Sequence, residues 1–214
     1  MSDFRIKTYQ VGQIGTNCYV IYREDLKKAI IVDPGDDGAY ILKQCEALLV
    51  EPEAILLTHG HFDHIMGVAE IKQAYPEIKI FAGEKERRML SDPSVNMSFR
   101  MGRTCFVEAD HFMSDGETLE AAGITLNVIA TPGHTEGSVC YYRKEDDVLI
   151  SGDTLFLESL GRTDLPGGNP TQIITSIREK LFILPGDTMV YPGHGDVTTI
   201  GHEKMYNPVA SYRG

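Results

Sequence analysis

The sequence predicts an α/β (α+β) fold, a four-layer αββα sandwich, on three observations. Short apolar runs typical of strands alternate with amphipathic helical segments along the 214 residues. These runs fall into two strand-rich halves, and helices follow each half. Histidine- and aspartate-bearing loops follow strands of both halves. Two packed sheets with helices outside bury every apolar face, and we expect the polar loops to meet at the shared rim of the sheets.

The composition bounds the class of protein. A chain of this length holds one sizeable core, and no linker or low-complexity segment divides it, so we predict a single domain over residues 1–214. The formal net charge of −11 argues against a nucleic-acid partner. Charges near the start and the absence of a long apolar run lead us to expect a cytoplasmic protein with no membrane partner. The four cysteines contain no C-x-x-C pair and are expected to be reduced, mostly buried thiols.

The first half is expected to open with a meander and to continue with alternating strands and helices. The apolar runs place strands at 4–11, 17–22, 29–32, 54–57 and 78–82. The helical periods fall at 39–49, from Asp63 to about 72, and at 84–90. Residues 92–112 have no clear period, and either lining an active-site mouth or covering a sheet edge would account for so long a loop. His111 within it is expected to be a surface or packing residue.

The second half repeats the alternation. Strands are expected at 124–129, 148–150 and 188–191, and a helix at 170–181 with Pro170 in its first turn. A turn at 198–203 leads into a last short helix, where His202 is expected either to cap the helix or to support a metal ligand.

The run T-H-G-H-F-D-H at 58–64 carries the chemistry of the first half. It places three histidines and an aspartate directly after a buried strand, although the whole chain has only seven histidines. In an extended segment alternate side chains share a face, so His59 and His61 can reach one ion. Asp63 is expected to cap the following helix, and Asp63 and His64 then point elsewhere. The simplest interpretation is two neighbouring metal ions, one bound by His59 and His61 and the other by Asp63 and His64.

This H-x-H-x-D-H run resembles the signature of the metallo-β-lactamase superfamily. Three later loops resemble its other motifs: T-P-G-H-T-E-G-S at 131–138, S-G-D-T at 151–154, and Y-P-G-H-G at 191–195. The resemblance implies a metallo-β-lactamase fold. It also makes Asp33, at the end of the third strand, more than a turn residue, since it would hold the outer NH of a ligand histidine.

The resemblance implies a dinuclear centre. His59, His61 and His134 would bind one ion, Asp63, His64 and His194 the other, and Asp153 would bridge both, with Asp63 and Asp153 the expected catalytic residues. Nitrogen and oxygen ligands without thiolate suit zinc, and also iron or manganese. Two divalent ions, two carboxylates and a bridging hydroxide leave about one positive charge, which would acidify bound water and polarise a carbonyl.

The closest branch is that of the glyoxalase II-like hydrolases, which cleave thioesters. True β-lactamases generally lack a bridging aspartate and a histidine at the position of His64. Full-length glyoxalase II enzymes carry a C-terminal helical domain that binds glutathione, whereas only twenty residues follow His194 here. We therefore expect a dinuclear metal-dependent hydrolase of a small ester or thioester. One alternative is a mononuclear iron persulfide dioxygenase that uses His59, His134 and Asp153, because the G-R-T-D run at 161–164 occurs in both branches. The other is a lactonase, in which the same metal hydroxide would attack a cyclic ester.

Overall fold

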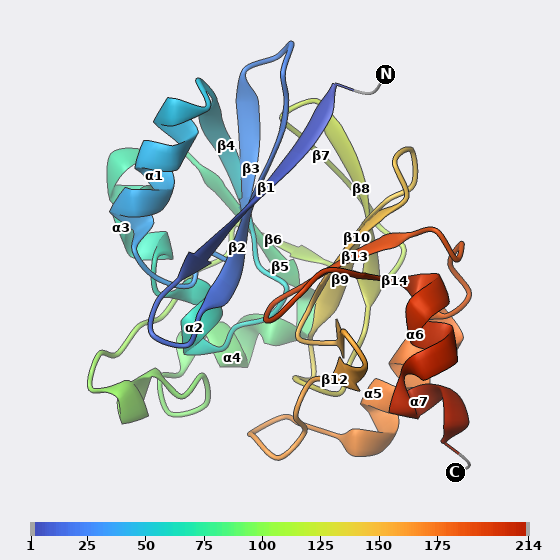
Figure 1. Cartoon of the computed structure of the whole chain (residues 1–214). Coiled ribbons are helices and arrows are strands. Elements are labelled where there is room, and N and C mark those ends of the chain that lie inside the picture. The colour runs from blue at the N-terminus through green and yellow to red at the C-terminus, as the bar shows by residue number, and fades with distance from the viewer. Residues whose placement is uncertain (1–2, 213–214) are drawn as a thin grey trace.

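The computed structural model describes residues 3–212, and these form two six-stranded sheets that pack face to face (Figure 1). The first sheet has the strand order β1-β2-β3-β4-β5-β6, and the second has the order β14-β13-β10-β9-β8-β7. A small hairpin, β11-β12, forms a separate two-stranded sheet. The predicted two halves therefore correspond to two sheets.

The observed elements follow the predicted sequence of strands and helices. The strands are β1 (Phe4–Val11), β2 (Thr16–Arg23), β3 (Lys28–Val32), β4 (Glu51–Leu56), β5 (Lys79–Gly83), β6 (His111–Met113), β7 (Thr118–Ala121), β8 (Ile124–Ala130), β9 (Val139–Arg143), β10 (Val148–Gly152), β11 (Leu155–Phe156), β12 (Ser159–Leu160), β13 (Met189–Pro192) and β14 (Thr198–Thr199). The helices are α1 (Gly38–Ala47), α2 (Phe62–Ile65), α3 (Val68–Ala74), α4 (Arg87–Ser91), α5 (Pro170–Ser176), α6 (Ile200–Tyr206) and α7 (Pro208–Ser211). Short 3-10 helices, η1 (Glu84–Glu86) and η2 (Ser98–Met101), and a π-helical turn, η3 (Ile177–Leu181), complete them.

Three separate apolar cores establish the four layers. The outer face of the first sheet packs against α1 and α3, with Ile41 and Ile71 fully buried. The two inner faces pack against each other around Tyr19 and Tyr141, which are also fully buried. The outer face of the second sheet packs against α5, η3, α6 and α7. Because both faces of each sheet are covered, the predicted αββα sandwich is confirmed.

The sheet topology brings the polar loops to one rim. Strands β3, β4, β5 and β6 are parallel, so their carboxyl ends share an edge of the first sheet. In the second sheet β10 is parallel to β13, and both run in the same direction as β8, because β9 is antiparallel to both β8 and β10. The loops that follow β4, β8, β10 and β13 carry the four motifs found in the sequence.

Hydrogen bonds between the halves hold the motif-bearing rims of the two sheets together. The side chain of Asn17 in β2 donates to the carbonyl oxygens of Pro192 and Gly195 at 3.0 and 2.9 Å, and the Tyr19 hydroxyl donates to Pro192 at 2.6 Å. In the other direction, the Tyr141 hydroxyl of β9 donates to the carbonyl of Leu57 at 2.9 Å. Each half thus holds a motif-bearing loop of the other half.

Two local predictions need correction. The helix expected from Asp63 to about 72 is broken into α2 and α3, where the backbone NH of Gly67 donates to the carbonyl of Pro34 at 2.8 Å outside the helix. The N-cap of α2 is His61 and not Asp63, whose side chain makes no capping hydrogen bond and faces His194 instead.

The segment 92–112 both lines the cavity at the rim and covers an edge of the first sheet. Met97 reaches the cavity at the rim, whereas Val107 and Phe112 pack on the first sheet and β6 adds an edge strand to it. His111 stacks on Phe81 with ring centroids 4.8 Å apart, as expected of a packing residue. The helices in residues 3–212 are all too short or too polar to cross a membrane.

Candidate metal centre

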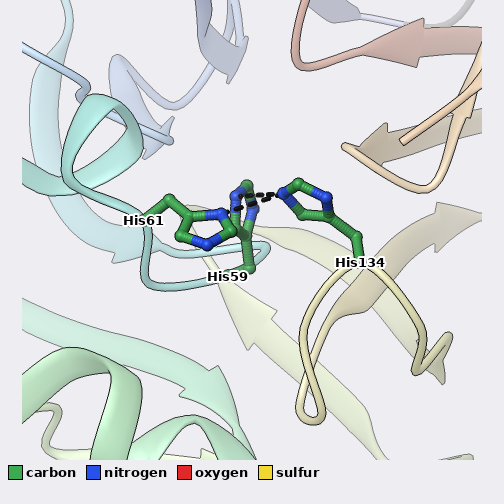
Figure 2. Close-up of side chains that lie close together, drawn as sticks. All are labelled: His59, His61 and His134. Carbon is green, nitrogen blue, oxygen red and sulfur yellow. Dashed lines mark hydrogen bonds between the residues drawn. The ribbon is translucent and has the colours of Figure 1, made fainter. Parts of the chain in front are cut away.

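The first cluster, which we call the histidine cluster, consists of His59, His61 and His134. Figure 2 shows the three rings directed toward one point from two loops that are far apart in the sequence. Nε2 of His134 lies 3.2 Å from Nε2 of His59 and 2.9 Å from Nδ1 of His61. Three nitrogens bound to one tetrahedral zinc ion at ~2.1 Å would lie about 3.4 Å apart. The spacing of the cluster therefore suits a single ion.

The outer nitrogens of two of these rings already have partners. Nδ1 of His134 donates to the carbonyl of Arg162 at 2.8 Å. Nδ1 of His59 lies 3.2 Å from the Thr58 hydroxyl, which itself donates to Asp33 at 2.6 Å. Both rings therefore present a lone pair on Nε2, and two lone pairs that face each other repel unless a cation lies between them. His61 differs, because its inward nitrogen is Nδ1 and its buried Nε2 has no hydrogen-bond partner among the described residues.

The histidine cluster is uncharged. Burial, reinforced by the neighbouring histidines, lowers the pKa of His59 far below its ordinary value, and burial also lowers the pKa of His61 and of His134. Neutral imidazole is the form that binds a metal ion, so no proton has to leave before binding at neutral pH.

The second cluster, which we call the mixed cluster, consists of Asp63, His64 and His194. Oδ2 of Asp63 lies 3.2 Å from Nε2 of His194 and 3.6 Å from Nε2 of His64. His64 is fully buried, whereas a quarter of the His194 side chain is exposed. The mixed cluster therefore forms the side of the centre that opens to solvent.

Asp153 lies between the two clusters. Its Oδ2 is 3.5 Å from Nε2 of His134 in the histidine cluster and 3.6 Å from Nε2 of His194 in the mixed cluster. Its Oδ1 is buried, lies 3.5 Å from Nε2 of His64 and has no hydrogen-bond partner in the part of the chain that the structure describes. A carboxylate in this place is within reach of an ion in either cluster.

The mixed cluster carries negative charge that the histidine cluster lacks. Burial acts to lower the pKa of His64, but the carboxylates of Asp153, Asp63 and Asp33 outweigh it and raise that pKa to about 10. Burial acts to raise the pKa of Asp63, but His64 and His194 outweigh it and hold that pKa well below its ordinary value. A proton on His64 thus partly neutralises a group of carboxylates that would also attract a divalent cation.

The residues fit metal ions better than they fit a hydrogen-bonded core. Nε2 of His64 and Oδ1 of Asp153 are buried and unpartnered within residues 3–212, which is costly unless a ligand occupies the space between them. Asp33 lies near His59 and His64 but is not available as a ligand. Its carboxylate already accepts hydrogen bonds from the Thr58 backbone and hydroxyl and from Nδ1 of His64 at 2.9 Å. Asp33 therefore orients the ring of His64 directly and that of His59 through Thr58, as the family resemblance implied.

Glu86 is a part of the centre that the sequence did not reveal. Its carboxylate is 1% exposed and accepts hydrogen bonds from Gly60, between His59 and His61, and from Thr135 and Gly137, just after His134. Burial raises the pKa of Glu86 to about 7. It lies in a charged stretch that resembled an exposed helix, and its sequence context gave no sign of burial.

A cavity of about 460 Å³ opens onto both clusters. Its polar wall is formed by five of the predicted site residues, His61, Asp63, His134, Asp153 and His194. Its apolar wall is formed by Ile14, Phe62, Met97, Phe156, Leu160 and Leu165. Arg162 is the one lysine or arginine among the described lining residues, and its guanidinium forms two hydrogen bonds of 2.7 Å with Asp164. A small, largely apolar molecule suits this space.

The structure brings all seven predicted site residues to this rim, but it separates His202 from them. Nε2 of His202 lies 3.0 Å from the carboxylate of Glu158, and Thr199 is the N-cap of α6. The expectation that His202 caps a helix or supports a ligand was therefore wrong. Its position in the first turn of α6 turns its side chain toward the β11-β12 hairpin.

Comparisons with known proteins agree with the fold. The family model of the metallo-beta-lactamase superfamily matches residues 11–194, a range that begins in β1 and ends at His194. The chain is 40% identical over 200 residues to a probable metallo-hydrolase, YqgX, of Bacillus subtilis, covering 92% of this chain and 93% of the relative. It is 35% identical over 206 residues to the hydroxyacylglutathione hydrolase GloC of Haemophilus influenzae, covering 95% of this chain and 96% of the relative.

Two solved structures support the same assignment. The crystal structure of BLEG-1 B3 metallo-beta-lactamase superposes with a TM-score of 0.91 at 42% identity, covering 97% of this chain and all of that chain. The crystal structure of TTHA1623 in a di-iron-bound form superposes with a TM-score of 0.83 at 30% identity, covering 94% of this chain and 98% of that chain. With a matching family model, full-length relatives and two clusters able to bind metal ions, the chain belongs to the metallo-β-lactamase superfamily.

Proposed function

We propose that this protein is a dinuclear metal-dependent hydrolase of small thioesters. The observation that carries the proposal is the position of Asp153, whose two oxygens lie within 3.6 Å of nitrogens from both clusters. His59, His61 and His134 would hold one ion, and Asp63, His64 and His194 the other, with Asp153 across both. The donor set suits zinc, and iron and manganese also accept it; the di-iron form of TTHA1623 supports iron as a candidate.

The ions, when bound, would supply an acidified water and a Lewis acid for the carbonyl oxygen. The chain's own residues do the rest. Thr58, Asp33 and the Arg162 carbonyl hold ligand histidines in fixed orientations through their outer nitrogens. The apolar wall of the cavity, which includes Phe62 and Phe156, excludes water and holds the acyl or thiol part of the substrate.

A thioester fits because no proton donor is needed for its leaving group. A thiolate leaves readily at neutral pH, since thiols ionise near ~8.5. Among the described residues that line the cavity, the histidines and carboxylates are the proposed ligands, and the guanidinium of Arg162 is paired with Asp164. The likeness to GloC supports a glutathione thioester as one member of the class.

Metal analysis beside a substrate panel tests the proposal. The panel contains lactoylglutathione, a thioester of an uncharged thiol, a lactone and a β-lactam, the last because of the likeness to BLEG-1. We expect close to two metal ions per chain and turnover of at least one thioester. A protein that binds two ions and leaves every thioester untouched would contradict the proposal.

The iron-dependent persulfide dioxygenase is the second candidate, because His59, His134 and Asp153 lie close enough to form a two-histidine, one-carboxylate face. Oxygen uptake with glutathione persulfide by iron-loaded protein, together with one metal ion per chain, would favour this candidate over the hydrolase.

A further inference from the structure

We propose that Glu86 is a positioning residue for the histidine cluster, because its buried carboxylate fastens the loop of His59 and His61 to the loop of His134. The inference rests on the proposed function in one respect: it assumes that the histidine cluster binds a metal ion. It adds a residue that lies outside all four sequence motifs, at the junction of η1 and α4.

The hydrogen bonds of Glu86 reach both ligand-bearing loops. Oε2 accepts from the backbone NH of Gly60 at 2.8 Å, and Gly60 lies between two residues of the cluster. Oε1 accepts from the Thr135 hydroxyl and from the backbone NH of Gly137 at 3.0 Å. Thr135 follows His134 directly. One carboxylate therefore spans two loops that lie some 75 residues apart in the sequence, as His59 and His134 do.

Close packing at the two glycines makes this a rigid junction. A Cβ on Gly137 would lie 2.5 Å from the backbone nitrogen of Glu86, and a Cβ on Gly60 would lie 2.8 Å from the Met89 side chain. Both loops thus rest directly on the backbone or side chains of 85–90, with no space for adjustment. The distances within the histidine cluster depend on how these loops meet.

The chemistry of the contact explains why a carboxylate is used. Three donors converge on Glu86, so an acceptor with two oxygens satisfies all of them. Among residues 3–212, no lysine or arginine forms an ion pair with Glu86. Its role is therefore to accept hydrogen bonds from the loops and not to balance a basic side chain. A glutamine would keep the shape but would point an NH₂ group at one of the donors.

Glu203 offers a matched control. It is also fully buried, and its carboxylate also accepts three hydrogen bonds: from the Thr198 hydroxyl at 2.6 Å, from the Glu158 backbone at 2.9 Å, and from the Asn207 side chain at 2.8 Å. These partners lie in β14, at the C-cap of α6 and in the β11-β12 hairpin, and they include none of the proposed ligands. Glu203→Gln should therefore disturb folding to a similar degree without altering the histidine cluster.

The test compares wild type, Glu86→Gln and Glu203→Gln in three measurements. These are the thermal unfolding of the metal-free protein, the affinity for the first metal ion, and the absorption spectrum of the cobalt(II) form. We expect Glu86→Gln to weaken the binding of the first ion about 10- to 100-fold and to shift the cobalt spectrum, as loss of a residue that orients ligands does. Glu203→Gln should change the affinity less than about threefold and leave the spectrum as in wild type.

Gly137→Ala provides a second variant that keeps the charge of Glu86. It forces the loop away from Glu86, so it should shift the cobalt spectrum in the same way. If Glu86→Gln and Gly137→Ala both bound the first ion as wild type does, the inference would be wrong. Equal weakening by Glu203→Gln would also overturn it, since a general loss of stability would then explain the effect. A wild-type protein that bound no metal ion would refute the proposed function itself.

Discussion

The histidine cluster and the mixed cluster lie side by side, but they are built on opposite electrostatic principles. The histidine cluster is buried and neutral, and its rings are held by hydrogen bonds that Nδ1 of His59 donates to the Thr58 hydroxyl and Nδ1 of His134 donates to the Arg162 carbonyl. The mixed cluster is partly exposed and acidic. Burial acts to lower the pKa of its His64, but the surrounding carboxylates outweigh burial and raise that pKa to about 10.

The difference indicates two ways to attract an ion. A neutral cluster binds through geometry, because three lone pairs already point at one place before the ion arrives. An acidic cluster binds through charge and tolerates a looser arrangement. We expect the first ion to enter the histidine cluster and the second ion to bind more weakly in the mixed cluster. The four predictions below test this contrast.

Asp153→Ala should have the largest effect, because Asp153 is within reach of both clusters. Loss of a residue that only orients ligands costs ~10- to 100-fold, so loss of a shared ligand should lower kcat/KM by at least about 100-fold. Metal content should fall together with activity. Two retained ions and wild-type turnover, measured by metal analysis and a thioester assay, would exclude a bridging role.

His194→Ala should separate the two clusters. It removes a ligand from the mixed cluster only, and the histidine cluster keeps all its nitrogens. We expect one metal ion per chain and thioester turnover reduced by about tenfold or more. Full activity with a single ion would instead point to a mononuclear enzyme.

Asp33→Asn tests whether one carboxylate orients histidines of both clusters. Asp33 accepts from His64 directly and reaches His59 through Thr58. The backbone at Asp33 has φ 49°, which asparagine tolerates well, so the variant should fold. We expect both ions to bind about tenfold more weakly, whereas Thr58→Val should weaken the first ion only. Calorimetric titration with zinc checks both variants, and an unchanged second site in Asp33→Asn would contradict the expectation.

The last prediction concerns the dependence of stability on pH, and it involves neither metal binding nor turnover. Burial raises the pKa of Glu86 from 4.5 to about 7, so the folded chain holds this proton more tightly than the unfolded chain does. Stability from this group is present below pH 4.5 and is lost as the pH rises toward 7, by about 3 kcal/mol at most. In metal-free protein, urea unfolding should show this decline in wild type relative to Glu86→Gln between these two pH values. A constant difference between the two proteins would mean that Glu86 ionises normally.

Motif residues and buried strands were predictable, because their signals are local. The apolar run before His59 and the alternation within the run 58–64 are properties of neighbouring residues, and they correctly placed β4 and the convergence of His59 with His61. The capping role given to Asp63 was wrong because a tertiary contact with His194 outweighs a local preference.

Residues that act only through distant partners gave no such signal. Glu86 sits in a charged stretch, and only the folded chain places Gly60 and Gly137 against it. Asn17 likewise resembles any polar residue at a strand end until its side chain meets the carbonyl of Pro192. The break between α2 and α3 gave no local signal either, since the backbone NH of Gly67 there donates to the carbonyl of Pro34 outside the helix.

The exchange of contacts between the halves has a kinetic consequence. Asn17 and Tyr19 of the first half hold the loop that carries His194, while Tyr141 of the second half holds the strand that leads to His59. Neither cluster can take shape from one half alone, so ligand convergence has to await the docking of two sheets through contacts of long sequence separation, which form slowly. Metal uptake during refolding would then report the last cooperative step, and an ion bound there would slow the reverse process of unfolding.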